Sequence, residues 1–114
     1  MITSDSIRGY NDVIILAILA QKDSYGYEIA KEIRARTQEL YVIKETTLYS
    51  AFTRLERQKL IQSYPGKETH GKKRTYYTIT AKGKSLLTTK KQEWREAKII
   101  VNEFLEGGEN HEND

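Results

Sequence analysis

Residues 45–61 read ETTLYSAFTRLERQKLI, and a second informative stretch, KKRTYYTIT, follows at residues 72–80. In the first stretch, Leu48, Phe52 and Leu55 recur at the spacing of one helix face, which predicts a short amphipathic helix. In the second stretch, alternating side chains predict a strand, and the glycines before it predict a turn. A helix followed by a basic hairpin is the sequence pattern of a winged helix-turn-helix.

The outer side of this predicted helix is rich in hydroxyl groups, whereas ordinary exposed helix faces favour Glu, Lys and Ala. Small polar side chains suit the major groove of DNA, and Lys and Arg around a hairpin turn suit phosphate contact. We therefore expect double-stranded DNA as a partner. The predicted contact residues are Lys44, Thr46, Thr47, Tyr49, Ser50, Thr53 and Arg54 on the helix and its entry, with Lys67, Lys72, Lys73, Arg74 and Tyr76 on the hairpin. For Tyr76, packing between strands is an equal alternative.

The distribution of charge supports a surface that binds a polyanion. The chain has 114 residues, enough for one core, and a formal net charge of +3. Residues 44–84 contain ten Lys and Arg against three Glu, whereas residues 106–114 contain four acidic residues and no Lys or Arg. Basic groups therefore gather around the helix and hairpin, and the acidic end is predicted to be a disordered tail.

Other classes of protein find little support in the sequence. The chain has no Cys, and neither His70 nor His111 lies in an apolar segment with a carboxylate partner. We expect no catalytic residue, no metal site and no cofactor, and hence no enzyme. The apolar run at residues 13–20 is too short to span a membrane, so a cytoplasmic protein without a membrane partner is expected.

The predicted fold class is mainly α with a small β-hairpin wing: a winged helix-turn-helix followed by one long C-terminal dimerisation helix. Ser24 is a candidate N-cap for the second helix. The predicted elements are helices at residues 7–21, 25–37, 45–58 and 80–105, and strands at residues 61–64 and 74–80. The predicted organisation is a DNA-binding domain at residues 1–80, the dimerisation helix at 81–106 and the disordered tail at 107–114.

The last predicted helix carries a partial heptad of apolar residues that the rest of the chain is too short to cover. We expect a second copy of the chain to cover it, through Leu87, Trp94, Ala97, Val101 and Phe104. Trp94 has two compatible interpretations. It is an interface anchor, or it lines a flat pocket between subunits, with Ile15 and Ala97, that binds a planar aromatic effector.

Several short motifs occur in a fixed order between residues 10 and 105. They are Tyr-Gly-Tyr-Glu-Ile at residues 25–29, Thr-Leu-Tyr at 47–49, Arg-Leu-Glu at 54–56, and Tyr-Tyr-Thr-Ile-Thr-Ala-Lys-Gly at 76–83. With these motifs the chain resembles the PadR family of bacterial transcriptional regulators, in its smaller subfamily with one C-terminal helix. The resemblance implies a dimeric winged-helix repressor that binds an inverted-repeat operator and is released by a small aromatic or multidrug-like compound at the dimer interface.

Two positions depart from the family pattern: Ser50, where relatives have Pro or another small residue, and Lys59, where relatives have Gly. Ser50 lies on the predicted recognition face, so it bears on which bases are read. The alternatives to a DNA-binding repressor are a winged-helix protein-interaction module without effector binding and an RNA-binding module. An RNA-binding module is disfavoured because such domains need aromatic residues exposed on an open sheet face.

Overall fold

The computed structural model describes residues 7–67 and 71–107. Its elements are the short 3-10 helix η1 (Arg8–Tyr10), α2 (Asn11–Gln21), β1 (Ser24–Tyr25), α3 (Gly26–Arg36), α4 (Glu45–Arg57), β2 (Ile61–Pro65), β3 (Thr75–Ile79) and α5 (Ala81–Leu105). The predicted mainly helical fold with a hairpin wing is confirmed. His70, His111 and the predicted tail from residue 108 lie outside the described residues.

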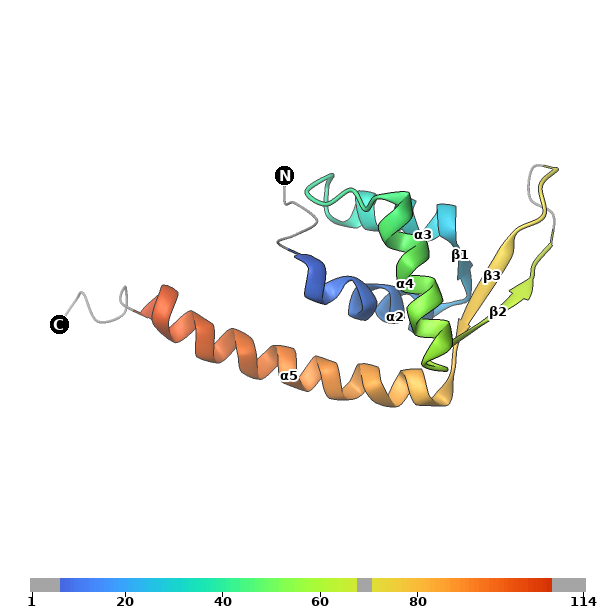
Figure 1. Ribbon diagram of the computed structural model, residues 1–114. Helices are drawn as coiled ribbons and strands as arrows, with labels where there is room; N and C mark the ends of the chain where they lie inside the picture. The colour runs from blue at the N-terminus through green and yellow to red at the C-terminus, as the bar shows by residue number, and fades with distance from the viewer. Residues whose placement is uncertain (1–6, 68–70, 108–114) are drawn as a thin grey trace.

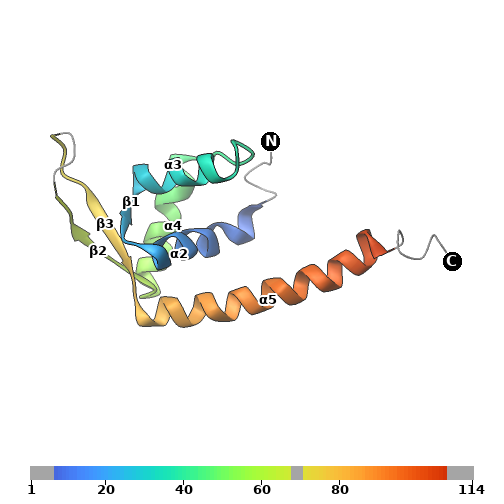
Figure 2. The same ribbon diagram turned by 180° about the vertical axis from the view of Figure 1, so that it is seen from behind.

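Helix α2 lies at the centre of the fold, between α3 and α4 on one side and α5 on the other (Figures 1 and 2). Ile15, Leu16 and Leu19 are at most 2% exposed. Helices α4 and α5 and strand β3 all pack against α2, so its apolar residues spread around much of its circumference. The helix begins later than predicted, because residues Arg8–Tyr10 form the tighter turn η1.

Helix α4 buries only one face. Leu48, Ala51, Phe52 and Leu55 are at most 2% exposed, and the helix ends at Arg57, close to the predicted end. Lys59, just beyond it, has a φ of 62°. A side chain in this left-handed conformation costs roughly 1–2 kcal/mol relative to glycine, which explains why a Gly suits this position in the family pattern.

The sheet has three antiparallel strands in the order β1-β3-β2, and the hairpin of β2 and β3 forms the wing, residues 61–79. The short strand β1 was not predicted: Ser24 pairs with Tyr77 and Tyr25 with Tyr76. Ser24 is therefore a strand residue rather than the predicted N-cap, and its hydroxyl donates to Glu28 Oε1 at 2.5 Å. A two-residue strand is too short to show alternation in the sequence.

Helix α5 begins at a junction that joins three elements. Thr80 caps the helix by accepting from the Gly83 amide at 3.0 Å, and its own hydroxyl donates to the Lys59 carbonyl at 2.8 Å. The Thr80 amide donates to the Leu60 carbonyl at 3.0 Å. The end of α4, the start of β2 and the start of α5 are thereby held together.

The later part of α5 leaves the core and extends beyond the helices of the domain (Figure 1). Leu87 is 4% exposed, whereas Phe104 is 83% exposed. In the described part of the chain, no helix, α5 included, has a stretch apolar and long enough to cross a membrane.

Replacing Gly83 by Ala is expected to destabilise the fold. A methyl group there would overlap the Leu60 carbonyl oxygen and the Ile79 side chain, and backbone cannot move aside cheaply. We expect a loss of roughly 1–3 kcal/mol in the free energy of unfolding, measured by urea denaturation. Gly9→Ala is the control, since Gly9 has open space around it. Equal stability of Gly83→Ala and wild type would contradict this packing.

Candidate functional site

The outer face of α4 presents the predicted hydroxyl groups to solvent. Thr46, Ser50 and Thr53 are exposed, and Thr47 is partly buried. The Thr53 hydroxyl donates back to the Tyr49 carbonyl at 3.1 Å. Lys44 is exposed at the N-cap position of the helix. The amino-terminal end of α4 and the end of the hairpin at which β2 stops and β3 starts lie on the same side of the molecule, away from α5 (Figures 1 and 2).

Tyr49 connects the start of α4 to the start of α3. Its ring meets Phe52 edge-on, with ring centres 5.4 Å apart, and is 45% exposed. A methyl group at Gly26 would overlap the Tyr49 hydroxyl, so the small residue lets the phenol lie directly over the backbone of α3. The hydroxyl is thus fixed at the edge of the exposed face.

Arg54 forms an ion pair with a side chain of another helix. Its Nε donates to Asp12 Oδ2 at 3.0 Å, and its NH2 group donates to Asp12 Oδ1 at 2.5 Å. These hydrogen bonds raise the pKa of Arg54 above its ordinary value. Arg54 therefore has a structural role between α4 and α2, and its contact with DNA stays a prediction.

Arg74 packs against tyrosines rather than extending from the wing. Its guanidinium lies 5.0 Å from the centre of the Tyr25 ring and 6.0 Å from that of Tyr27. Its Nε is buried and has no hydrogen-bond partner among the described residues. Together with Tyr49 and Lys73, these residues line a cavity of about 250 Å³, which we call the Arg74 cavity. Lys67, Lys72 and Lys73 are exposed.

Sequence reasoning missed Tyr25, Gly26 and Tyr27 as neighbours of the basic hairpin. The Tyr-Gly-Tyr motif was visible, but its place beside Arg74 depends on the pairing of β1 with β3. That pairing joins segments about 50 residues apart in sequence, and no local pattern encodes it.

The wing is stiffened by a row of tyrosines on its outer face. Tyr76 lies between Tyr25 and Tyr64: its ring centre is 5.2 Å from that of Tyr25 and 5.8 Å from that of Tyr64. The Tyr64 hydroxyl donates to Asp23 Oδ2 at 2.6 Å, and this hydrogen bond raises the pKa of Tyr64 to about 12. Tyr76 therefore has a packing role, and its contact with DNA stays a prediction.

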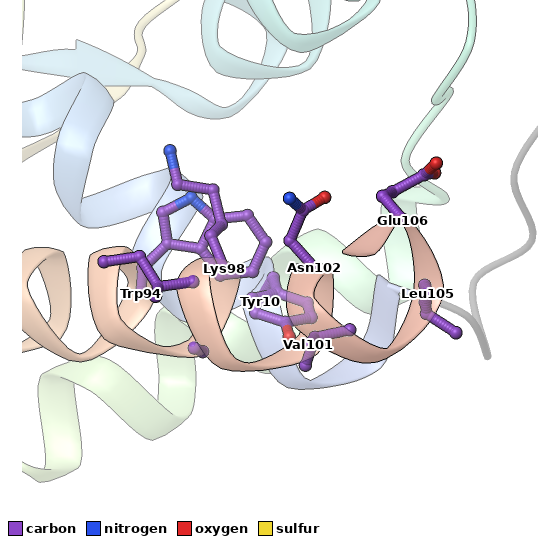
Figure 3. A pocket seen from close by; sticks show the side chains of 9 residues that line it. Tyr10, Trp94, Lys98, Val101, Asn102, Leu105 and Glu106 are labelled. Carbon is purple, nitrogen blue, oxygen red and sulfur yellow. The ribbon is translucent and has the colours of Figure 1, made fainter. Parts of the chain in front are cut away.

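A second candidate site lies on α5, where Trp94 meets Tyr10 edge-on, with ring centres 5.4 Å apart. Trp94 is 48% exposed, and the Lys98 ammonium lies 5.9 Å from the centre of its ring. An open depression of about 630 Å³, which we call the aromatic hollow, lies beside these residues (Figure 3). It is lined by Tyr10, Trp94, Ala97, Lys98, Val101 and Leu105, among others.

Two predicted residues of this region belong to the core instead. Ile15, predicted to contact an effector, has no exposed surface, and Leu87, predicted at the subunit interface, is 4% exposed. Both pack among residues of their own chain. Leu87 was predicted from a heptad pattern, which cannot distinguish a chain's own core from a partner's. The exposed apolar residues of later α5 include three that were not predicted: Ile99, Ile100 and Leu105.

Comparisons with known proteins agree on one family. The model of the transcriptional regulator PadR-like family matches residues 15–89. The chain is similar to the structure of a transcriptional regulator from Clostridium thermocellum, with 56% identity, a TM-score of 0.84 and coverage of 93% of this chain and 100% of that one. It is also similar to a PadR family transcription regulator from Clostridium difficile, with 45% identity, a TM-score of 0.74 and coverage of 84% and 98%. An uncharacterized protein of Lysinibacillus sphaericus is 49% identical over 107 residues, which are 94% of this chain and 98% of that protein.

Replacing Gly66 by Ala is expected to loosen the wing. A methyl group there would overlap the ring of Tyr76, so the ring must leave its place between Tyr25 and Tyr64. We expect faster hydrogen exchange of the β2 and β3 amides, measured by mass spectrometry or NMR, with little change in α2. Gln62→Ala, an exposed position on β2, is the control. Unchanged exchange in Gly66→Ala would mean that the tyrosine row does not stiffen the wing.

Proposed function

The chain belongs to the transcriptional regulator PadR-like family, and we propose that it regulates transcription by binding double-stranded DNA through α4 and the wing. One observation carries this proposal: the amino-terminal end of α4 and the hairpin of β2 and β3 extend to the same side of the molecule, away from α5 (Figure 1). Thr46, Ser50 and Thr53 are exposed on this helix, and Lys67, Lys72 and Lys73 are exposed on this hairpin. A helix of this kind fits the major groove, and a basic hairpin beside it can follow the phosphates. The activities of the relatives are regulatory rather than enzymatic.

In the proposed complex, Thr46, Ser50 and Thr53 contact base edges or phosphates in the major groove. Thr47 and Tyr49, at the start of the helix, set its register, and Lys44 contacts the backbone. Ser50 lies at the middle of the exposed face, so its small side chain lets the helix approach the bases closely. The sequence specificity of the protein is proposed to come from these residues.

Phosphate contacts are proposed for the wing and for the Arg74 cavity. Lys67, Lys72 and Lys73 supply exposed charges, which attract DNA of any sequence. The support for the cavity is that Arg74, Lys73 and Tyr49 line the same space. A guanidinium, an ammonium and a phenol hydroxyl are all donors that suit a phosphate group.

We also propose that the protein is a homodimer that represses transcription at an inverted repeat. The support is the cluster of exposed apolar side chains on later α5: Ile99, Ile100, Val101, Phe104 and Leu105. A large exposed apolar patch commonly marks a protein interface. A two-fold dimer of this kind can place two α4 helices about one DNA turn, roughly 34 Å, apart. Residues 1–80 would then bind DNA, and residues 81–106 would join the subunits.

A planar aromatic effector is proposed for the aromatic hollow. The support is the exposed faces of Trp94, with Tyr10 edge-on beside it. Offset or edge-on contacts between a planar aromatic ligand and such side chains stabilise the bound ligand. Binding there would relieve repression only if the ligand prefers one dimer geometry over another.

The wing lysines are expected to act on DNA of every sequence. In Lys72→Ala/Lys73→Ala, each lost phosphate contact should remove about 0.9 from the slope of log affinity against log salt concentration. Fluorescence anisotropy with a labelled random-sequence duplex measures this slope. Lys90→Ala/Lys91→Ala removes the same charge from α5 and is the matched control. An unchanged slope in the wing variant would contradict phosphate contact by the wing lysines. Stronger binding to single-stranded RNA than to duplex DNA, or a lack of any DNA binding, would contradict the proposed function.

Phe104→Asp is expected to give a folded monomer. Phe104 is 83% exposed, so its replacement should leave the core intact, whereas a carboxylate buried between two subunits is strongly unfavourable. The dissociation constant of the dimer should rise by roughly two orders of magnitude or more, measured by sedimentation. Lys84→Asp, an exposed position early in α5, is the control. A Phe104→Asp variant as dimeric as wild type would place the interface elsewhere.

Trp94 is the single tryptophan of the chain, so its fluorescence reports on the aromatic hollow. Proflavine, as a planar cation, and naphthoate, as an aromatic acid, should be titrated separately, and quenching of Trp94 is expected for at least one class. Trp94→Ala should abolish binding of that compound in calorimetry while the dimer persists. If the variant becomes monomeric, Trp94 is an interface anchor first. A stable dimer in which neither compound quenches Trp94 would contradict the effector site.

A further inference from the structure

Three consecutive residues at the start of α2 contact three different parts of the molecule. Tyr10 meets the Trp94 ring edge-on. Asn11, 5% exposed, accepts a hydrogen bond from the Tyr41 hydroxyl at 2.7 Å. Asp12 forms the paired hydrogen bonds with Arg54 of α4. The aromatic hollow and α4 are therefore joined through one short segment, residues 10–12.

The contacts of this segment hold α4 at two points. Tyr41 lies in the connector that leads into α4, and its backbone amide donates to the Thr37 hydroxyl at 3.1 Å. Asn11 thus fixes the path by which the chain enters the helix. Asp12 fixes Arg54, which lies in the last turns of the same helix. One contact is thus made near the end of the helix and the other on the connector before it, and together they restrain the position and direction of α4.

The polar contacts are more sensitive to small movements than the apolar packing between α2 and α4. Core side chains tolerate small shifts because dispersion contacts have little directional preference. A paired Arg–carboxylate contact needs both hydrogen bonds aligned in one plane. A displacement that leaves the core intact can therefore still change the Asp12–Arg54 contact.

We propose that residues 10–12 couple the aromatic hollow to the orientation of α4. Tyr10 and Trp94 both line the aromatic hollow and touch edge-on, so a planar molecule that binds there displaces Tyr10 from its contact with Trp94. When Tyr10 moves, Asn11 and Asp12 move with it, because they are the next two residues, and the two fixed points of α4 shift. Asn11 and Asp12 are positioning residues in this account. The proposal rests on the proposed function only for its consequence, a change in DNA affinity.

The coupling can be tested in the free protein, without DNA, by acrylamide quenching of Trp94. Asp12→Asn and Arg54→Lys, which keeps the charge but loses the planar fork, should both change the quenching constant, although neither residue touches Trp94. In a Tyr10→Ala background, Asp12→Asn should have no further effect, because the connection is already broken. Glu32→Gln, which removes the exposed Arg36–Glu32 ion pair of α3, should leave quenching unchanged. Circular dichroism checks that each variant is folded.

A second arm uses DNA and the planar probe that binds wild type. Coupling is reciprocal, so DNA should change the affinity of the probe, by roughly 2- to 30-fold in wild type. In Arg54→Lys, DNA should leave the affinity of the probe almost unchanged. The proposal would be overturned if neither Asp12→Asn nor Arg54→Lys changes the quenching constant of Trp94. It would also be overturned if the effect of Asp12→Asn simply adds to that of Tyr10→Ala. If DNA binding fails altogether, the proposed function fails, and the free-protein arm still decides the coupling.

Discussion

The fold depends on the burial of one face of α4, and everything that faces outward follows from it. Leu48, Phe52 and Leu55 lie against the core, and each fully buried side chain of this size contributes about 1.5–3 kcal/mol. Rotation of the helix would expose these apolar residues to water and bury the polar side chains of Ser50 and Thr53 in their place. The hydrophobic face therefore fixes the direction in which the proposed recognition face points.

Basic residues divide into two kinds of role. Arg54 and Arg74 are used within the chain, one in a paired contact with Asp12 and the other over tyrosine rings. The planar guanidinium suits both arrangements, because it can form two parallel hydrogen bonds and can lie flat on an aromatic ring. The lysines of the wing stay in solvent, where a flexible point charge can follow a phosphate backbone. Arg54 and Arg74 thereby position the proposed DNA-binding surface, and the wing lysines attract DNA; Arg74 is in addition proposed to contact a phosphate.

Sequence patterns predicted what depends on local periodicity. The apolar face of α4, the alternation in β3 and the Thr80 start of α5 lie close to where they were expected. The patterns could not predict strand β1, the partner of Arg54 or the burial of Leu87, since each depends on contacts between distant segments. The contact residues for DNA and effector stay predictions. The geometry adds a partner within the chain to Arg54 and to Arg74, and it places Ile15 in the core.

The central claim is that the exposed face of α4 reads the base sequence. The direct measurement first selects an operator for the wild-type protein from random duplexes, and then compares affinities for operator and random DNA. The account predicts that Ser50→Ala/Thr53→Ala lowers this ratio while binding to random DNA changes little, since single hydroxyl contacts contribute less than the roughly 1–3 kcal/mol of a paired base contact. Gln58→Ala, just beyond the helix, should keep the ratio. An unchanged ratio in the double variant would contradict insertion of α4 into the major groove.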